Sequence, residues 1–350
     1  MDSKTEINQD TQEINDQISV VKITALWAFS ESAFGGILHA LTIPFRGIFI
    51  NSAAVLFITL IALFSKNKKE ILKSTLIVLL IKALVSPYTP LTAYFAVTIQ
   101  GLSGYLLFLP KNIFKISTIL LGVFTLLFSG LQKIIVLTLV FGNTLWKSVN
   151  IFIKQISKEF FSININSDIH FGYVLIFVYL SIHVIAGVYI GIYAGLLPVK
   201  INRYKNEIPG ELFLQNDSNL PPKRKKKKKN WFVRPTGIMI AVISLTLLFY
   251  TYISPSSLEI GSNEIFVMLV RSIIITIIWL TLVGPIVKKL FQKYLAGKKS
   301  FYADEINEIM DLFPQFNKVV SYCWKNSSDK NGINRIHKFL STSFYYLLLS

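Results

Sequence analysis

Cysteine, histidine and charged residues are all scarce in this chain. Its 350 residues include one cysteine, Cys323, and four histidines. A single cysteine excludes an internal disulfide and a cysteine-based metal site, and the histidines lack the His-Glu-x-x-His spacing of a zinc site. No phosphate-binding loop of the Gly-x-x-x-x-Gly-Lys-Ser/Thr type occurs, which argues against ATP hydrolysis. We therefore expect no metal and no cofactor.

The low charge content predicts an integral membrane protein. Charged residues make up 16% of the chain and hydrophobic residues 52%, whereas soluble domains contain about 25% charged residues. Lysine and arginine outnumber acidic residues by 36 to 19. In membrane proteins this excess gathers in cytoplasmic loops, so we do not expect nucleic acid as a partner.

Long apolar segments predict an all-α, polytopic bundle of about eight membrane-spanning helices, six followed by two. Roughly 20 apolar residues cross a bilayer, which places crossings at 21–42, 47–64, 71–86, 90–109, 114–146, 170–197, 236–253 and 265–287. With both termini cytoplasmic, the inner loops hold 22 basic residues and the outer loops four. This imbalance favours that orientation in the plasma (inner) membrane. It also favours one long fifth helix over two helices broken near Ser129-Gly130, because the break would invert every later segment.

The same pattern divides the chain into five regions. We predict a flexible acidic cytoplasmic tail (1–19), a six-helix membrane domain (20–198), a basic cytoplasmic linker (199–235), a two-helix membrane hairpin (236–290) and an amphipathic cytoplasmic tail (291–350). Seven consecutive basic residues in the linker, Lys223–Lys229, should attract anionic lipid headgroups.

Apolar residues recur at helical spacing in the C-terminal tail on both sides of Pro314. They are Ile306, Ile309, Met310 and Phe313, then Phe316, Val319, Val320 and Cys323. The spacing predicts an amphipathic helix pair divided at the proline. Its apolar face either packs on the chain itself or on the membrane surface, or docks a cytoplasmic partner.

Glu31 lies about 15 Å into the first crossing, close to the bilayer centre. Charges at that depth are costly and usually face a partner or a wet cavity. Lys82 reaches a similar depth in the third crossing, and Gln100 and His183 also reach mid-depth. We predict an intramembrane ion pair between Glu31 and Lys82 within a polar layer, which either serves function or only fixes helix register.

Small residues line one face of the first crossing: Ala28, Ser32, Gly36 and Ala40. Such faces permit close helix contact in lipid, either within this bundle or with another membrane subunit. A similar row in the sixth crossing, Gly187, Gly191 and Gly195, is predicted to pack internally.

Polar and aromatic residues near the outer ends of the first four crossings, together with mid-depth groups, predict a substrate site. The candidates are His39, Arg46, Lys82, Tyr88, Tyr94 and Gln100. Aromatic walls with a few polar anchors are typical of small-molecule sites. The alternative is a set of interfacial aromatics around a capped hairpin.

Residues 20–198 resemble the substrate-binding S component of energy-coupling factor (ECF) vitamin transporters. The likeness rests on the six helices, the small face of the first helix, the "LHALTIPFRG" turn and "SPYTPLTAYFAVTIQG" from Ser86 to Gly101. The resemblance implies a membrane subunit, not an enzyme, that captures a vitamin or related metabolite from outside. It also implies docking through the first helix on a transmembrane coupling subunit driven by two ATPases.

The chain departs from that family after the sixth helix, where an S component normally ends. The tail lacks the Ala-Arg-Gly motif of the family's coupling subunit and has Arg335 in "GINRIHK" instead. A membrane scaffold that recruits partners through the basic linker and the tail is therefore the alternative function. An intramembrane enzyme is disfavoured because no Gly-x-Ser-x-Gly motif, zinc motif or paired acids occur.

Overall fold

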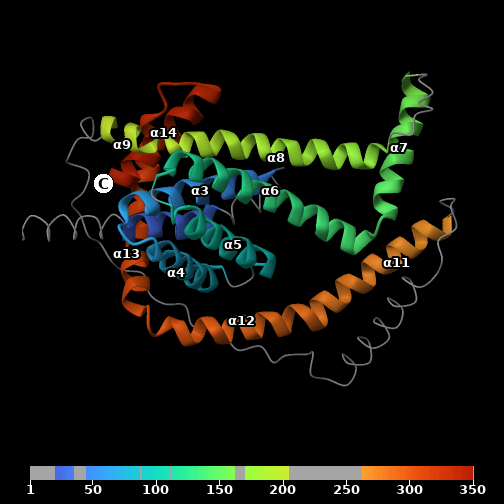
Figure 1. The fold of residues 1–350 in the computed structure, drawn as a ribbon, viewed down its shortest axis with the longest axis horizontal. Coiled ribbons are helices and arrows are strands. Elements are labelled where there is room, and N and C mark those ends of the chain that lie inside the picture. Colours follow the sequence, from blue (N-terminus) through green and yellow to red (C-terminus); the bar gives the residue numbers. More distant parts are fainter. Residues whose placement is uncertain are drawn as a thin grey trace, which may run out of the picture. The chain divides into compact units, whose positions relative to one another are not determined.

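The computed structural model describes residues 20–34, 45–86, 89–110, 112–161, 170–204 and 262–349, which are helical and contain no strand (Figure 1). Four helical segments in these ranges are long and apolar enough to cross a membrane. They are α3 (Arg46–Phe64), α6 (Phe114–Phe141), α8 (Phe171–Gly195) and the continuous segment Phe266–Lys299. The prediction of an all-α protein with membrane-spanning helices is confirmed to this extent. The predicted crossing 236–253 lies outside the described residues.

Shorter elements complete the described chain. The first helix comprises residues 20–29 and continues into the π turn η1 (Ser30–Phe34). The others are α4 (Lys69–Val85), α5 (Leu91–Leu107), α7 (Thr144–Phe161), α9 (Leu197–Tyr204), α11 (Ser262–Ile278), η4 (Trp279–Val283), α12 (Gly284–Lys299), α13 (Ala303–Asn326) and α14 (Gly332–Leu349).

These elements belong to two units, which are described separately. Among the described residues, the first unit takes the chain up to Leu126, residues 184–204 and residues 295–349. The second takes residues 127–183 and the segment from 262 to Tyr294. The helices α6, α8 and α12 therefore contribute residues to both units.

The long fifth segment forms one helix, as predicted. α6 has 28 residues and spans about 42 Å at the α-helical rise. It passes through Ser129-Gly130 without a break and ends at Phe141 rather than near 146, because Gly142 adopts a φ of 71°. The last crossing differs from the prediction in length. The prediction ends it at residue 287, yet the helix continues to Lys299. The lysines expected in the following inner loop (Lys288, Lys289, Lys293, Lys298 and Lys299) therefore lie on the helix.

In the second unit, α7 is an amphipathic helix that lies across the start of α8 (Figure 1). The Asn150 side-chain oxygen accepts a hydrogen bond of 2.9 Å from the backbone N–H of Phe171 and so caps α8. Phe152 and Phe160 are exposed, and Lys154 and Lys158 lie between them on the same helix. An amphipathic helix with exposed aromatics and lysines fits the membrane interface.

In the first unit, α6 and α8 are in backbone contact at glycines. A Cβ atom added at Gly191 would lie 2.5 Å from the Ile119 Cα and 2.7 Å from the Thr118 carbonyl oxygen. One added at Gly187 would lie 2.7 Å from the Gly122 carbonyl oxygen. The predicted internal packing of the glycine row of the sixth crossing is therefore confirmed.

The C-terminal tail folds differently from the predicted pair divided at Pro314. α13 runs through the proline as one helix, and the second helix, α14, starts only at Gly332. A proline inside a helix costs one hydrogen bond, or about 3 kcal/mol. Burial offsets this cost, because Ile309 and Phe316 share one buried face only if the helix is continuous across Pro314.

The tail packs on the first helix and on α3. The ring of Phe29 in the first helix makes edge contacts with those of Phe313 and Phe316, at centroid distances of 5.3 and 6.1 Å. On α14, the Phe344 ring lies 6.4 Å from that of Phe57 in α3. Of the predicted alternatives for the tail's apolar face, packing on the chain itself is the one that the structure shows.

Replacing Gly191 with alanine should force α6 and α8 apart. We expect the free energy of unfolding to fall by about 1–3 kcal/mol, as for other overpacked sites. Gly297→Ala is the matched control, because no atom lies within 4 Å of its added Cβ and alanine favours helix by about 1 kcal/mol. Thermal unfolding in detergent measures both variants, and equal stabilities would contradict the close contact.

Replacing Phe316 with alanine should loosen the tail. Phe316 is 2% exposed, and buried Phe→Ala changes cost about 3–5 kcal/mol. Limited proteolysis should then cut within residues 303–349 faster than in the parent protein. Phe301→Ala is the control because this side chain is 76% exposed. Unchanged cleavage in both variants would show that the aromatic contact does not hold the tail.

Candidate functional site

The buried acid of the first helix meets the lysine that the sequence analysis assigned to it. Lys82 Nζ on α4 donates a hydrogen bond of 2.5 Å to Glu31 Oε2 in η1. The two side chains are only 5% and 3% exposed. The predicted contact is therefore present, deep inside the first unit.

Helix register explains why these two side chains meet. The hydroxyls of Thr24 and Ser74 are hydrogen-bonded at 2.7 Å and are also buried. Glu31 follows Thr24 by seven residues and Lys82 follows Ser74 by eight, rises of about 10.5 and 12 Å. Because the two helices run in the same direction, the Thr24–Ser74 contact brings Glu31 and Lys82 to the same height along the pair.

The π turn at Ser30–Phe34 holds Glu31 in place. Ser32 Oγ donates to the Ala28 carbonyl oxygen at 2.5 Å, and Ser86 Oγ donates to the Ser32 carbonyl oxygen at 3.1 Å. Single π turns inside helices are frequent at functional sites. Sequence reasoning did not find this turn, because no residue pattern distinguishes it from an α-helical turn.

A second buried polar contact joins α5 to α3. Gln100 Nε2 donates to Asn51 Oδ1 at 2.5 Å, and both residues are buried. Asn51 was missing from the predicted site. Its signal in the sequence is an amide side chain within the otherwise apolar segment that forms α3.

Each of these contacts leaves one buried acceptor atom unmatched. Glu31 Oε1 and Gln100 Oε1 are buried and have no hydrogen-bond partner among the described residues. Thr59 Oγ1 on α3 and Trp27 Nε1 on the first helix are also buried without a hydrogen-bond partner among the described residues. Unmatched buried polar atoms are uncommon in folded proteins, and they mark places where a water, an ion or a ligand group would be stabilised.

The remaining residues of the predicted substrate site differ in where the structure places them. Tyr94 is buried, and its hydroxyl lies 3.5 Å from the Ser86 carbonyl oxygen. Arg46 is exposed at the start of α3. His39 and Tyr88 lie outside the described residues. The structure thus brings Lys82, Gln100 and Tyr94 into the interior of the first unit, whereas Arg46 is not part of it.

The small face of the first helix is covered by the chain itself over its described part. Ala28 is fully buried and Ser32 is 4% exposed. Gly36 and Ala40 lie outside the described residues. Internal packing is therefore the role that the structure shows for the first two members of this face.

The interior of the first unit combines buried polar groups of several kinds. It contains one ion pair, one amide pair and hydroxyls. Within the described residues, no three histidine, cysteine, aspartate or glutamate side chains are grouped as metal ligands. His183, which was predicted near this layer, is buried in the second unit, with Nδ1 2.9 Å from the Tyr179 carbonyl oxygen. Each buried pair thus presents one acceptor oxygen, and that of Glu31 belongs to a carboxylate paired with an ammonium group.

Breaking the ion pair on one side should destabilise the protein strongly. Lys82→Met leaves Glu31 buried without its cation, and the expected loss is about 3–5 kcal/mol of unfolding free energy. The double variant Glu31→Leu/Lys82→Met is the control, since replacing both charges with apolar groups is often neutral or stabilising. If Lys82→Met unfolds at the parental temperature, the pair contributes nothing to the fold.

Comparisons with known proteins identify no relative of this chain. No family model matches the chain, and neither a curated protein nor a solved structure was found to match it. The resemblance of residues 20–198 to the S component therefore stays a prediction that rests on short sequence motifs.

Proposed function

We propose that this chain is an integral membrane subunit that binds a small polar solute for uptake, with the polar centre around Glu31 and Gln100 as the solute site. One observation supports this most directly. A buried ion pair and a buried amide pair in the first unit each present an unmatched acceptor oxygen. Ionisable residues inside a membrane are rare and commonly mark substrate or ion pathways.

The geometry of the centre favours a solute that donates hydrogen bonds. Glu31 Oε1 and Gln100 Oε1 are acceptors, so an ammonium, amide or hydroxyl group would satisfy them. Lys82 has three N–H bonds and gives one to Glu31, which leaves donors for a carboxylate or carbonyl on the same solute. A metabolite with both kinds of group would fit this centre.

The motif resemblance extends this proposal to the energy source. As an S component, the chain would have its six-helix domain in the plasma membrane, both termini cytoplasmic, and a vitamin or related metabolite as its solute. It would deliver that solute by docking on a coupling subunit with two ATPases. Ala28 and Ser32 are covered within the chain, so we assign any such docking to the Gly36 and Ala40 end of the first helix.

The scaffold alternative receives less support. Its docking surface was the apolar face of the tail, and that face packs on the first helix and α3. Deleting residues 300–350 would expose Phe29 and Phe57 and so would not distinguish the two functions. The block Lys223–Lys229, outside the described residues, keeps its proposed role of attracting anionic headgroups.

Isolation of the tagged protein from its native membrane in mild detergent tests the proposal. We expect mass spectrometry to identify a coupling-type membrane protein and two ATPases. Gly36→Leu should abolish their recovery, whereas Gly297→Leu, on the exposed side of α12, should not. Recovery of other partners, or of none, would count against a coupled transporter.

A thermal-shift screen of vitamins and related metabolites then tests the solute site. A ligand at 100 times its Kd should stabilise the folded protein by about 2.7 kcal/mol. The variant Glu31→Leu/Lys82→Met should lose that shift while keeping its own folded baseline. A ligand shift that is equal in both proteins would place the solute elsewhere.

A further inference from the structure

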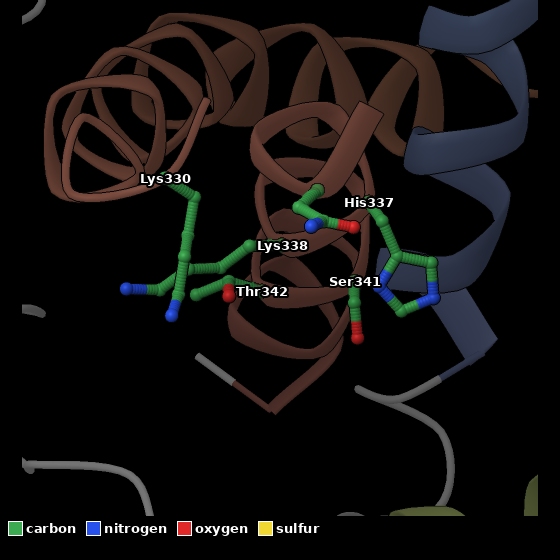
Figure 2. Close-up of a pocket in the computed structure, with 6 residues that line it drawn as sticks. Lys330, His337, Lys338, Ser341 and Thr342 are labelled. Atoms are coloured by element: carbon green, nitrogen blue, oxygen red, sulfur yellow. The ribbon is translucent and has the colours of Figure 1, made fainter. Parts of the chain in front are cut away.

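A polar pocket lies on the C-terminal tail, apart from the buried centre. It has a volume of about 390 Å³ and is lined by Lys330, Asn334, His337, Lys338, Ser341 and Thr342 (Figure 2). Small-molecule sites typically have volumes of about 300–1,000 Å³. The pocket was not found from the sequence, because α14 itself was not predicted.

Helix geometry gathers these side chains. Asn334, Lys338 and Thr342 follow one another at intervals of four residues, so they share one face of α14. His337 and Ser341 form the adjacent row, and Lys330 reaches over from the turn before the helix. Figure 2 shows Lys330, Lys338 and Thr342 at one end of the pocket and Ser341 and His337 at the other.

Contacts on other sides of α14 hold the pocket in position. Phe339 packs edge-on against Trp324 of α13, with ring centroids 5.1 Å apart. The Arg335 guanidinium lies over the same indole, 4.3 Å from its centroid. Tyr345 is buried and Phe344 packs on α3. The pocket residues are therefore presented by an anchored helix.

The lining has one chemical property in common. All six side chains can donate hydrogen bonds, two of them are ammonium groups, and no carboxylate is among them. Asp329 lies next to the pocket and accepts hydrogen bonds of 2.9 Å from Lys338 through both carboxylate oxygens. Lys338 has three N–H bonds, so at least one remains for a ligand.

The neighbouring acid does not cancel the positive charge of the pocket. The hydrogen bonds from Lys338 hold the pKa of Asp329 below its ordinary value, so the Asp329 carboxylate is charged at neutral pH and forms an ion pair with Lys338. The Lys330 ammonium adds one further positive charge. A negatively charged ligand therefore completes the balance.

We propose that this pocket binds a phosphoryl group. A tetrahedral oxyanion accepts several hydrogen bonds from different directions and pairs with clustered ammonium groups. The volume exceeds that of a bare phosphate, which leaves room for the organic part of a phosphorylated metabolite or for a phospholipid headgroup. This site is independent of the solute-uptake proposal and of the Lys223–Lys229 block.

Binding to the full-length protein in nanodiscs tests the pocket. The background carries glutamine at residues 223–229, so that this block does not contribute. Glycerol 3-phosphate, titrated by calorimetry in phosphatidylcholine discs, probes a soluble ligand. Phosphatidic acid retained in native mass spectra probes a headgroup. We expect Lys330→Gln/Lys338→Gln to weaken at least one probe, by about fivefold for each lysine.

Two controls separate pocket binding from general charge attraction. Lys318→Gln/Lys325→Gln removes the same charge from exposed positions of α13 outside the pocket and should leave affinity unchanged. Asp329→Asn breaks the ion pair but keeps every pocket donor, so binding should be retained or strengthened. Pocket dependence for only one probe supports the site and identifies its source. If neither probe binds, or if both lysine pairs matter equally, the proposal is overturned.

Discussion

The ion pair between Glu31 and Lys82 is the constraint on which the first unit depends. The interior of the first unit does not solvate a charge, so each buried charged group must find its partner within the protein. This requirement fixes the first helix against α4 at one height. The Thr24–Ser74 and Ser86–Ser32 hydrogen bonds lie below and above it on the same pair of helices. The buried side chains of Gln100 and Asn51 likewise find a polar partner in each other, between α5 and α3.

In lipid, close backbone packing provides the stabilisation between helices that burial of apolar surface provides in water. Helices there gain little from hiding apolar surface from one another, so contact distance matters more. Gly187 and Gly191 bring α8 onto α6, and Gly104 of α5 lies directly beside Ile58 of α3. Polar contacts therefore select which helices pair and at what height, whereas glycines determine how near they come. Both devices act between α5 and α3, whereas the first helix and α4 are joined by polar contacts and α6 and α8 by glycines.

Depth arithmetic was sufficient to predict the pairing of Glu31 with Lys82, because helical rise converts sequence position into height. The same arithmetic could not predict the η1 turn or the role of Asn51, since both depend on the angle at which neighbours face one another. The local free-energy cost of a proline predicts a helix break at Pro314. The burial of Phe316 compensates this cost, but it depends on tertiary contacts that the sequence does not reveal. α14 was also not predicted, although it packs on α13, its neighbour in the sequence, through Phe339 and Trp324.

The contacts of the tail with the bundle determine how a ligand bound to the tail could affect the buried polar centre. α13 lies against Phe29, two residues from Glu31, and α14 contacts α3 on one face while its polar face forms the phosphoryl pocket. A ligand in that pocket can influence the buried centre only if it binds one tail position more tightly than another. The edge contacts of Phe29 with Phe313 and Phe316 are then the elements that such a preference would have to strengthen or release. The Phe57–Phe344 ring contact and the Lys73–Glu305 ion pair join the tail to the bundle as well, so they would contribute to any such coupling.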